Sequence, residues 1–241
     1  MSQYEIKSMK EAIAGNPYVG RGIVIGKSED GEKAMFAYFI MGRSENSRNR
    51  IFKENGDEVI IYPYDESKVE DPSLIIYSPV KKVANKVIVT NGDQTDTIEE
   101  ALKNGKCFRH ALKSRAFEPD APNFTPRISG ILNLDGEYTY SLSILKSADA
   151  QGSACNRYTF DYEPLNGLGH FIHTYVTDGN PLPTFLGEPE RVKIPNDVRA
   201  FADEIWNNLD KNNKISLYCR AIDLKSGAVE SILINGHEVN A

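Results

Sequence analysis

Short runs of apolar and β-branched residues, interrupted by turn residues, dominate the hydrophobic pattern of the chain. The first two runs, 22–27 and 34–41, are separated by Ser28-Glu29-Asp30-Gly31 and predict a buried hairpin. Further strands of the same kind are expected at 57–62, 74–78, 86–90, 127–134, 138–145, 156–162, 168–176, 214–223 and 228–234. The pattern therefore predicts a protein rich in β-structure.

Helical spacing of apolar residues is confined to a few segments. Helices are expected at 2–14, 97–104, 106–115 and 197–210. For the second of these, Thr97 followed by Glu100 has the pattern of a capping box. Prolines in 118–126 and 179–195 disfavour regular structure and predict a shaped loop and an arm, respectively.

The order of these elements predicts the fold class. Strands and helices come in blocks without strict alternation, which favours an α+β fold with largely antiparallel sheets covered by helices. No repeat, low-complexity segment or linker composition interrupts the chain. We therefore expect one domain over 1–241, with an N-terminal helix in 1–15 and an insertion or arm at 166–195.

Composition narrows the classes of function. The net charge of -6 argues against a general nucleic-acid binder or a protein of anionic membranes. The three cysteines lack metal-ligand spacing, and no apolar run is long enough to span a membrane. The first ten residues are polar and of mixed charge, unlike a signal peptide. We expect a cytoplasmic protein with reduced thiols.

Three familiar patterns are disfavoured by their context. Gly26-Lys27-Ser28 lacks the upstream glycine of a phosphate loop and runs into an acidic turn. His170 and His173, three apart on an expected strand, face opposite sides and cannot chelate one ion together. Ser2 opens a polar helix that should fray, so it is a poor N-terminal nucleophile.

An arginine-rich loop follows the second expected strand. The stretch Arg43-Ser44-Glu45-Asn46-Ser47-Arg48-Asn49-Arg50 combines three guanidinium groups with short hydrogen-bonding side chains. Guanidinium forks and hydroxyls suit a phosphate monoester. The alternative is a solvated basic turn, paired with Glu45 or Glu54.

Two further loops carry candidate polar groups. Thr90-Asn91-Gly92-Asp93-Gln94-Thr95-Asp96 joins a strand to a helix, where side chains and free amides can contact a heterocycle or a ribose. Plain helix capping is the alternative reading. Glu118, before Thr125-Pro126-Arg127-Ile128, is an acid on a proline-stiffened loop; its alternative is a surface carboxylate.

Together these stretches resemble the archaeal-type IMP cyclohydrolase family, as a longer, bacterial-like member. The matching stretches, in the family's order, are Tyr18-Val19-Gly20-Arg21, Arg43-Ser44 with Arg48, Tyr77, Val89-Thr90-Asn91-Gly92 with Thr95-Asp96, and Glu118 with Thr125-Pro126-Arg127-Ile128. They cover residues 17 to about 132. Beyond residue 150 the resemblance is thinner, and 166–195 looks longer than the archaeal pattern.

The resemblance implies a fold and a reaction. The fold is a four-layer αββα sandwich like that of the N-terminal-nucleophile hydrolases, without their nucleophile. The reaction is ring closure of 5-formamidoimidazole-4-carboxamide ribonucleotide (FAICAR) to IMP with loss of water, the last step of purine synthesis. No metal or organic cofactor is expected. The expected partners are this substrate and product and further copies of the chain in a homo-oligomer, with no nucleic acid or membrane.

The resemblance also gives hypotheses for individual residues. Arg21 would bind the oxyanion or the carboxamide oxygen, while Tyr77 and Glu118 would move protons or orient the formamide. The expected substrate-binding residues are Arg43, Ser44, Asn46 and Arg48 at the phosphate, Asn91, Thr95 and Asp96 near base or ribose, and Thr125 and Arg127. Arg127 could serve either the ligand or Glu118. The alternatives are a non-catalytic purine-nucleotide-binding protein and an amidohydrolase on the same fold.

Overall fold

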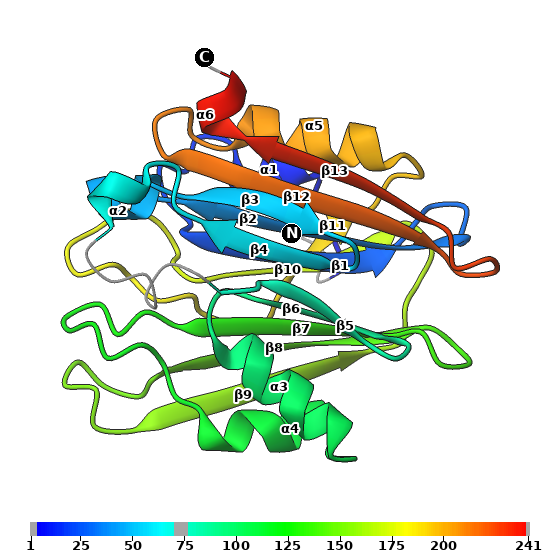
Figure 1. The fold of residues 1–241 in the computed structure, drawn as a ribbon, viewed down its shortest axis with the longest axis horizontal. Helices are drawn as coiled ribbons and strands as arrows, with labels where there is room; N and C mark the ends of the chain where they lie inside the picture. The colour runs from blue at the N-terminus through cyan, green and yellow to red at the C-terminus, as the bar shows by residue number, and fades with distance from the viewer. Residues whose placement is uncertain (1–3, 70–76, 240–241) are drawn as a thin grey trace.

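The computed structural model describes residues 4–69 and 77–239, which form two antiparallel sheets and a few helices (Figure 1). The six-stranded sheet has the order β11-β10-β1-β2-β12-β13, and the seven-stranded sheet runs β3-β4-β5-β6-β7-β8-β9. The strands of the first sheet are β1 (Arg21–Lys27), β2 (Lys33–Met41), β10 (Leu168–His173), β11 (Glu190–Lys193), β12 (Lys214–Asp223) and β13 (Val229–Asn235). Those of the second are β3 (Ile51–Asn55), β4 (Glu58–Tyr62), β5 (Val80–Val83), β6 (Lys86–Thr90), β7 (Arg127–Asn133), β8 (Thr139–Ser147) and β9 (Cys155–Tyr162).

The predicted hairpin of β1 and β2 lies at the centre of the six-stranded sheet. Its residues pair in register, with Ile23 opposite Tyr38. The turn is held by Ser28, whose hydroxyl donates to Asp30 Oδ1 at 2.6 Å. Gly26-Lys27-Ser28 thus ends a strand in a turn, as its sequence context indicates. On its other side β1 pairs with β10.

The helices are short apart from two. They are α1 (Met9–Ile13), α2 (Glu45–Arg48), α3 (Gln94–Lys103), α4 (Phe108–Ala111), α5 (Val198–Asn208) and α6 (Gly236–Val239), with 3-10 turns at Glu66–Lys68 and Leu112–Ser114. At the start of α5, the Asp197 side chain accepts from the Ala200 amide at 2.7 Å and so caps the helix.

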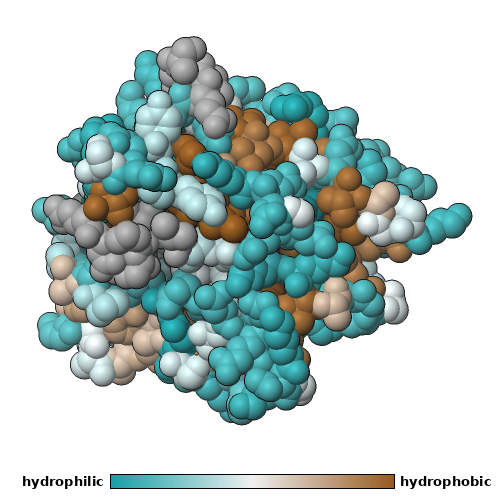
Figure 2. Space-filling model, viewed as in Figure 1, coloured by the Kyte–Doolittle hydropathy of each residue, from teal (hydrophilic) through white to brown (hydrophobic). Residues whose placement is uncertain are grey.

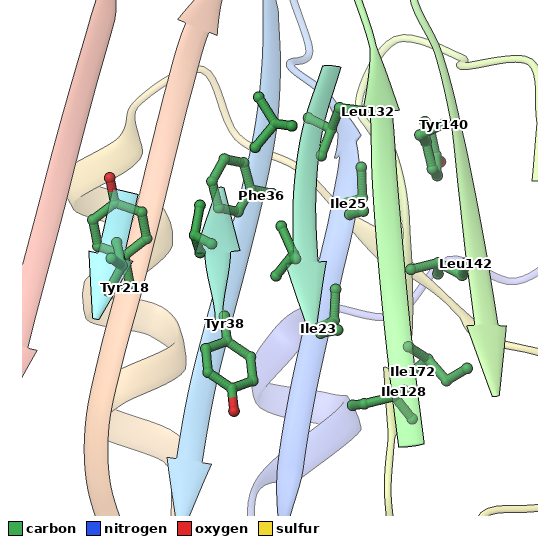
Figure 3. Packing of buried hydrophobic residues seen from close by; sticks show 14 of the residues in the cluster. Ile23, Ile25, Phe36, Tyr38, Ile128, Leu132, Tyr140, Leu142, Ile172 and Tyr218 are labelled. Carbon is green, nitrogen blue, oxygen red and sulfur yellow. The ribbon is translucent and has the colours of Figure 1, made fainter. Parts of the chain in front are cut away.

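Three hydrophobic clusters hold the sheets and helices together. The largest joins side chains of both sheets, among them Ile23 and Tyr38 on one and Ile128 and Leu142 on the other (Figure 3). A second cluster packs α1 and α5 on the six-stranded sheet, and a third packs α3 and α4 on the seven-stranded sheet. Each sheet is buried on one face by the cluster between the sheets and on the other face by a cluster under helices. The central strands are therefore nearly continuous apolar runs in the sequence.

Several predicted boundaries were wrong, each for a local reason. The helix expected at 2–14 begins only at Met9, because Ser8 forms its capping box with Glu11 while Lys7 bridges to β11. The helix expected at 97–104 begins at Gln94, so Thr97 lies inside it rather than at its cap. The expected arm 166–195 contains two strands of the six-stranded sheet, β10 and β11.

Other elements were missed or lie outside the description. The sequence patterns did not predict the short strands β3 and β5 or the helical turn α2. The strand expected at 74–78 falls largely on 70–76, outside the described residues. The face shown in Figure 2 is mostly hydrophilic, with scattered apolar patches. Within the described ranges, no helix is long and apolar enough to cross a membrane.

Candidate active site

A cavity of about 790 Å³ opens where strand ends of the two sheets meet. It lies at the start of β1 and β7 and beyond the ends of β2, β6 and β10. Its lining is rich in charged and hydroxyl groups: Tyr18, Arg21, Arg43, Ser44, Ser47, Arg50, Tyr77, Asn91, Gly92, Asp93, Glu118, Pro119, Asp120, Asn123, Thr125, Arg127, Thr174, Tyr175 and Leu182. The volume is within the range of small-molecule sites.

The backbone conformation of Gly20, just before β1, places Arg21 at the cavity. Gly20 has φ +77°, and a Cβ there would lie 2.1 Å from Thr174 Oγ1, so only glycine fits. The Thr174 hydroxyl in turn accepts from the Arg21 amide at 3.1 Å. The guanidinium donates to the carbonyl oxygen of Met41 at the end of β2. Arg21 is thereby held at the junction of two adjacent strands.

A second arginine, Arg50, lies near Arg21. Its Nε is buried and has no hydrogen-bond partner within the described residues. Burial lowers the pKa of the Arg50 guanidinium, and the positive charge of Arg21 lowers it further. Neither arginine has a carboxylate partner among the ion pairs of the described chain. The pair is therefore suited to an anionic or oxygen-rich group.

Tyrosine hydroxyls surround this pair. The Tyr77 hydroxyl donates to the carbonyl oxygen of Asn91 at 2.8 Å and lies 3.2 Å from the Tyr38 hydroxyl. Burial raises the pKa of Tyr38 well above its ordinary value. Tyr38 therefore stays neutral and fixes the direction of Tyr77 by hydrogen bonding.

Glu118 also lines the cavity and belongs to a network of charged side chains around Arg127. Arg127 donates from Nη2 to Glu118 Oε2 at 3.0 Å, and from Nη1 to Asp93 Oδ1 at 2.6 Å and to Gln94 Oε1 at 2.7 Å. Burial raises the pKa of the Glu118 carboxyl, and Arg127 only partly offsets this effect; Asp93 raises it further. Arg127 thus bonds to Glu118 and also lines the cavity, which is compatible with either of the two roles predicted for it.

The rim of the cavity carries the predicted phosphate residues Arg43 and Ser44. The Arg43 guanidinium pairs with Asp178, donates to the Gly179 carbonyl at 3.0 Å and lies 5.1 Å from the centre of the Tyr18 ring. Ser44 caps α2, accepting from the Ser47 amide at 3.1 Å. The arginine-rich loop therefore reaches across to a segment far along the chain, rather than forming an isolated basic turn.

A chain of hydrogen bonds supports the wall at Tyr175. Its hydroxyl lies 2.6 Å from that of Thr125, which itself bonds to Asp120. Burial raises the pKa of Tyr175 to about 12. Behind the wall, the Tyr175 carbonyl accepts from His173 Nδ1 at 2.7 Å, and His173 Nε2 lies 3.3 Å from Glu190.

The N-terminal segment joins this support. Lys7 makes an ion pair with Glu190 at 2.5 Å. Its backbone also donates to the Arg191 carbonyl at 3.0 Å and accepts from the Lys193 amide at 2.8 Å. The backbone of residue 7 therefore covers the outer side of β11, next to strand β10, which leads to Tyr175.

Four of the predicted substrate-binding residues do not line the cavity. Asn46 is exposed on α2, and Arg48 donates to Gly42 and Asn213 away from it. Thr95 is buried and bonds to the Thr90 hydroxyl at 2.6 Å. Asp96 pairs with Lys81 at 2.8 Å.

Asn91 lines the cavity with its side chain already engaged. Its amide nitrogen donates to the Pro126 carbonyl at 2.9 Å, and its amide oxygen accepts from Gln94 and Ile128. Asn91 therefore supports the loop, and Tyr77 uses its carbonyl oxygen.

Several cavity residues were not among the predicted ones, and those with polar side chains are Tyr18, Ser47, Arg50, Asp93, Asp120, Asn123, Thr174 and Tyr175. Tyr18 lies inside a stretch that carried the family resemblance, and Arg50 lies in the arginine-rich loop, so proximity in sequence was a usable signal. Thr174 and Tyr175 come from the expected arm and had no such signal.

The histidines have structural partners. His170 Nδ1 lies 2.7 Å from the Tyr140 hydroxyl, and its ring stacks on Tyr162 with centroids 3.6 Å apart. Burial lowers the pKa of His170 to about 4. His173 contacts Tyr175 and Glu190 instead, so the two rings do not share a ligand. Across the described ranges, no group of three or more His, Cys, Asp and Glu side chains could hold a metal ion.

The fold and cavity define a two-sheet β-rich protein with a pocket lined by arginine and tyrosine side chains. A sequence model of the family described as IMP cyclohydrolase-like protein matches residues 18–227, and the chain belongs to this family. The IMP cyclohydrolase of Methanococcus aeolicus is 35% identical over 163 residues, which are 66% of this chain and 74% of the relative. That of Methanopyrus kandleri is 37% identical over 162 residues, 66% of this chain and 75% of the relative.

Proposed function

We propose that the protein is an IMP cyclohydrolase that closes the pyrimidine ring of FAICAR to give IMP and water. One observation within the structure carries this proposal: Arg21, Tyr77 and Glu118, predicted from separate motifs, line a single cavity. Membership of the IMP cyclohydrolase-like family over residues 18–227 supports the same reaction.

The reaction is a dehydration within one molecule. The carboxamide nitrogen attacks the formyl carbon, forming the new C–N bond, and the formyl oxygen becomes a hydroxyl on a tetrahedral carbon. One proton leaves the carboxamide nitrogen and one leaves the formamide nitrogen, and the former formyl oxygen departs with both as water. Since both reacting groups belong to the substrate, holding them in the closed rotamer supplies a large share of the rate.

We assign the oxygen that gains negative charge to Arg21 and Arg50. Both guanidinium groups line the cavity, and the buried Arg50 Nε has no partner within the described residues. Fixed positive charge in a partly desolvated site stabilises a developing oxyanion with little reorganisation. Arg21 is the better placed of the two, because Met41 and the Gly20 turn hold it rigidly.

We assign proton transfer to Glu118, with Tyr77 orienting the formamide. Burial raises the pKa of Glu118, so its carboxyl can accept the amide proton and return it to the departing hydroxyl. Arg127 holds the carboxyl through two nitrogens and so keeps its direction fixed. Tyr77 already donates to a backbone carbonyl and can accept one hydrogen bond from the substrate.

We place the 5′-phosphate at the rim, against Arg43 and the hydroxyls of Ser44 and Ser47. These three groups line the cavity. Arg43 is paired with Asp178, and a phosphate would take the place of that carboxylate. Thr125, bonded to Tyr175, is then on the wall facing the ribose or base.

We also propose that the architecture is the four-layer αββα sandwich of the N-terminal-nucleophile hydrolases. The three hydrophobic clusters, one between the sheets and one under each helical layer, support this arrangement. Strand β1 begins with Arg21 rather than with serine, threonine or cysteine, so a strand-start nucleophile is replaced by a cation. A cytoplasmic location remains a prediction from composition.

The test is direct assay of the intact purified protein with FAICAR, following IMP by absorbance and chromatography. The proposal expects conversion far above the uncatalysed rate, with one IMP formed per FAICAR consumed. Binding of IMP without conversion of FAICAR would refute the enzyme and leave a nucleotide-binding protein.

A further inference from the structure

Strand β9 is an edge without a neighbour. It ends the seven-stranded sheet beyond β8, at the lower side of the molecule in Figure 1. Within the described residues, no strand pairs with its outer side. Its sequence, Cys155-Asn156-Arg157-Tyr158-Thr159-Phe160-Asp161-Tyr162, contains no proline, lysine or glycine to block pairing.

The other sheet edges are covered. Strand β11 is bridged by the backbone of Lys7. Strands β3 and β13 are clasped together by Asn235, which bonds to the Phe52 amide at 2.8 Å and to its carbonyl at 3.0 Å. The Ser231 hydroxyl adds a bond to Glu54. Among the sheet edges described, β9 is therefore the one whose outer backbone groups are not covered by another segment.

The direction of the free backbone groups follows from the register with β8. The Ala148 amide donates to the Ala154 carbonyl in the same register as the β8–β9 pairs. Because hydrogen-bonded positions alternate along an antiparallel ladder, the even-numbered residues of β9 bond to β8. The amide and carbonyl groups of Cys155, Arg157, Thr159 and Asp161 therefore point outward.

We propose that β9 pairs antiparallel with β9 of a second copy of this chain, about a two-fold axis at Thr159. The two seven-stranded sheets would then form one continuous sheet. Thr159 of one copy lies opposite Thr159 of the other, with both amides and both carbonyls available for exchange. The flanking outward positions, Arg157 and Asp161, add hydrogen-bonded pairs on either side.

Charge favours this register. About the Thr159 axis, Arg157 of each copy lies opposite Asp161 of the other, on the same face of the sheet. Arg157 donates only to the carbonyls of Arg115 and Cys155 within the described chain and has no carboxylate partner there. Asp161 pairs with Arg109 at 2.7 Å and accepts from the Ser141 hydroxyl at 2.7 Å, so Arg157 of the second copy would join a carboxylate that is already bonded on its own chain. An axis through Arg157 or through Asp161 would instead place like charges opposite each other, which is destabilising.

The other face of β9 supplies aromatic contacts. Tyr158 is 44% exposed, and Phe160 follows two residues later on the same side. About the Thr159 axis, Tyr158 of one copy lies opposite Phe160 of the other, an arrangement that stabilises antiparallel pairs. A second copy of β9 would therefore bond to the outward backbone groups, give Arg157 a carboxylate partner and cover the exposed Tyr158 ring.

The pairing would also bear on the active site. The turn that precedes β9 holds Gly152, where a Cβ would lie 2.6 Å from the Phe124 ring. Phe124 contacts Phe117 edge-on, with centroids 5.5 Å apart, and the two aromatics flank Glu118 in sequence on its loop. The β9 dimer would thus brace the loop that carries Glu118.

The first test is the mass of the intact protein by light scattering during gel filtration, over a dilution series. The wild type is expected at twice the 26.9 kDa mass of one chain. Thr159→Pro removes an outward amide without touching the bonds to β8, and is expected at the mass of one chain. The matched control Thr159→Val keeps the amide and should keep the double mass.

The register has its own test. Arg157→Asp places two acids opposite each other and should dissociate the dimer, while adding Asp161→Arg restores opposite charges and should restore the double mass. In a protein with Cys107→Ser and Cys155→Ser, Thr159→Cys should form an intermolecular disulfide under mild oxidation, since such paired Cα atoms lie about 5.5 Å apart. Arg157→Cys should not, because two copies of residue 157 are far apart.

A wild type that stays at the mass of one chain would overturn the proposal. So would a folded Thr159→Pro variant that keeps the double mass, because the dimer would then lie elsewhere. If Thr159→Pro does not fold, the cross-linking comparison decides: equal disulfide formation at positions 157 and 159, or none at 159, would overturn the proposal.

Discussion

Replacement of Glu118 by glutamine separates the chemistry of this carboxyl from its place in the structure. Glutamine keeps the shape of the side chain but cannot carry a proton to or from the substrate. Arg127 loses one of its two charged partners, yet it still donates to Asp93 and Gln94, so the wall should keep its geometry. The substitution therefore removes acid–base chemistry alone.

The expected loss in kcat follows from that limited role. A positioned general acid or base contributes about 10²–10⁴-fold, or about 2.7–5.4 kcal/mol of barrier. Orientation of the substrate and the charge of Arg21 remain, so turnover should fall by this factor and not to the uncatalysed rate. KM should change only a few-fold, because the phosphate contacts at the rim are untouched.

Stability should respond in the opposite sense. The pKa of Glu118 is raised in the folded protein above its ordinary 4.5. The folded state therefore holds this proton to a higher pH than the unfolded chain, and its stability falls as pH rises from the unfolded pKa to the folded pKa. Above that window the neutral glutamine avoids the cost of a buried charge. Tm at pH 7 should be unchanged or higher in Glu118→Gln.

The assay pairs initial rates of IMP formation with thermal unfolding at pH 7. Glu45→Gln is the matched control: its side chain is 84% exposed and meets Lys68 at 3.4 Å, so neither kcat nor Tm should move. In the wild type, the acidic limb of kcat/KM against pH should have its midpoint above 4.5 and should vanish in Glu118→Gln. A folded Glu118→Gln enzyme with kcat within about threefold of wild type would refute the assignment.

Three further changes test other parts of the site. Arg21→Ala should lower kcat by about 10²–10³-fold, as for loss of an oxyanion donor, with Tm measured beside it; unchanged kcat would contradict the assignment. Arg43→Ala should raise KM for FAICAR at least tenfold with a small change in Tm. Asp178→Asn removes the carboxylate that competes for Arg43 and should lower KM. An unchanged KM in both variants would refute the placement of the phosphate at the rim. Gly20→Ala should lower Tm by roughly 6–12 °C, from about 3 kcal/mol of backbone strain and overpacking. Its control Gly56→Ala, also at positive φ but with no heavy atom within 4 Å of the added Cβ, should lower Tm less.

The sequence predicted those elements whose pattern of apolar residues matches their burial in the folded protein. The hairpin of β1 and β2 and helix α5 are buried along their lengths, so their apolar periodicity was decisive. Strands β5 and β11 are only four residues long and half exposed, and their pairing depends on neighbours distant in sequence. No local pattern could predict them.

The same limit applies to the cavity. Arg21, Tyr77 and Glu118 were predicted from motifs and the structure brings them to one cavity, but the partners that fix them are remote. Arg43 meets Asp178, which is 135 residues away, and no spacing in the chain indicates that contact. Arg48 lies in the same arginine-rich loop and points elsewhere, because one turn of α2 directs the two arginines to different sides.

The bridge between Lys7 and β11 matters for how the protein can be shortened or fused. From Lys7 the connection runs through Glu190 and His173 to the carbonyl of Tyr175, whose hydroxyl faces the cavity. Deleting the chain through Lys7 would remove an ion pair and two backbone bonds from this wall, although Lys7 itself does not line the pocket. A trimmed N-terminus would therefore weaken the support behind this wall of the active site.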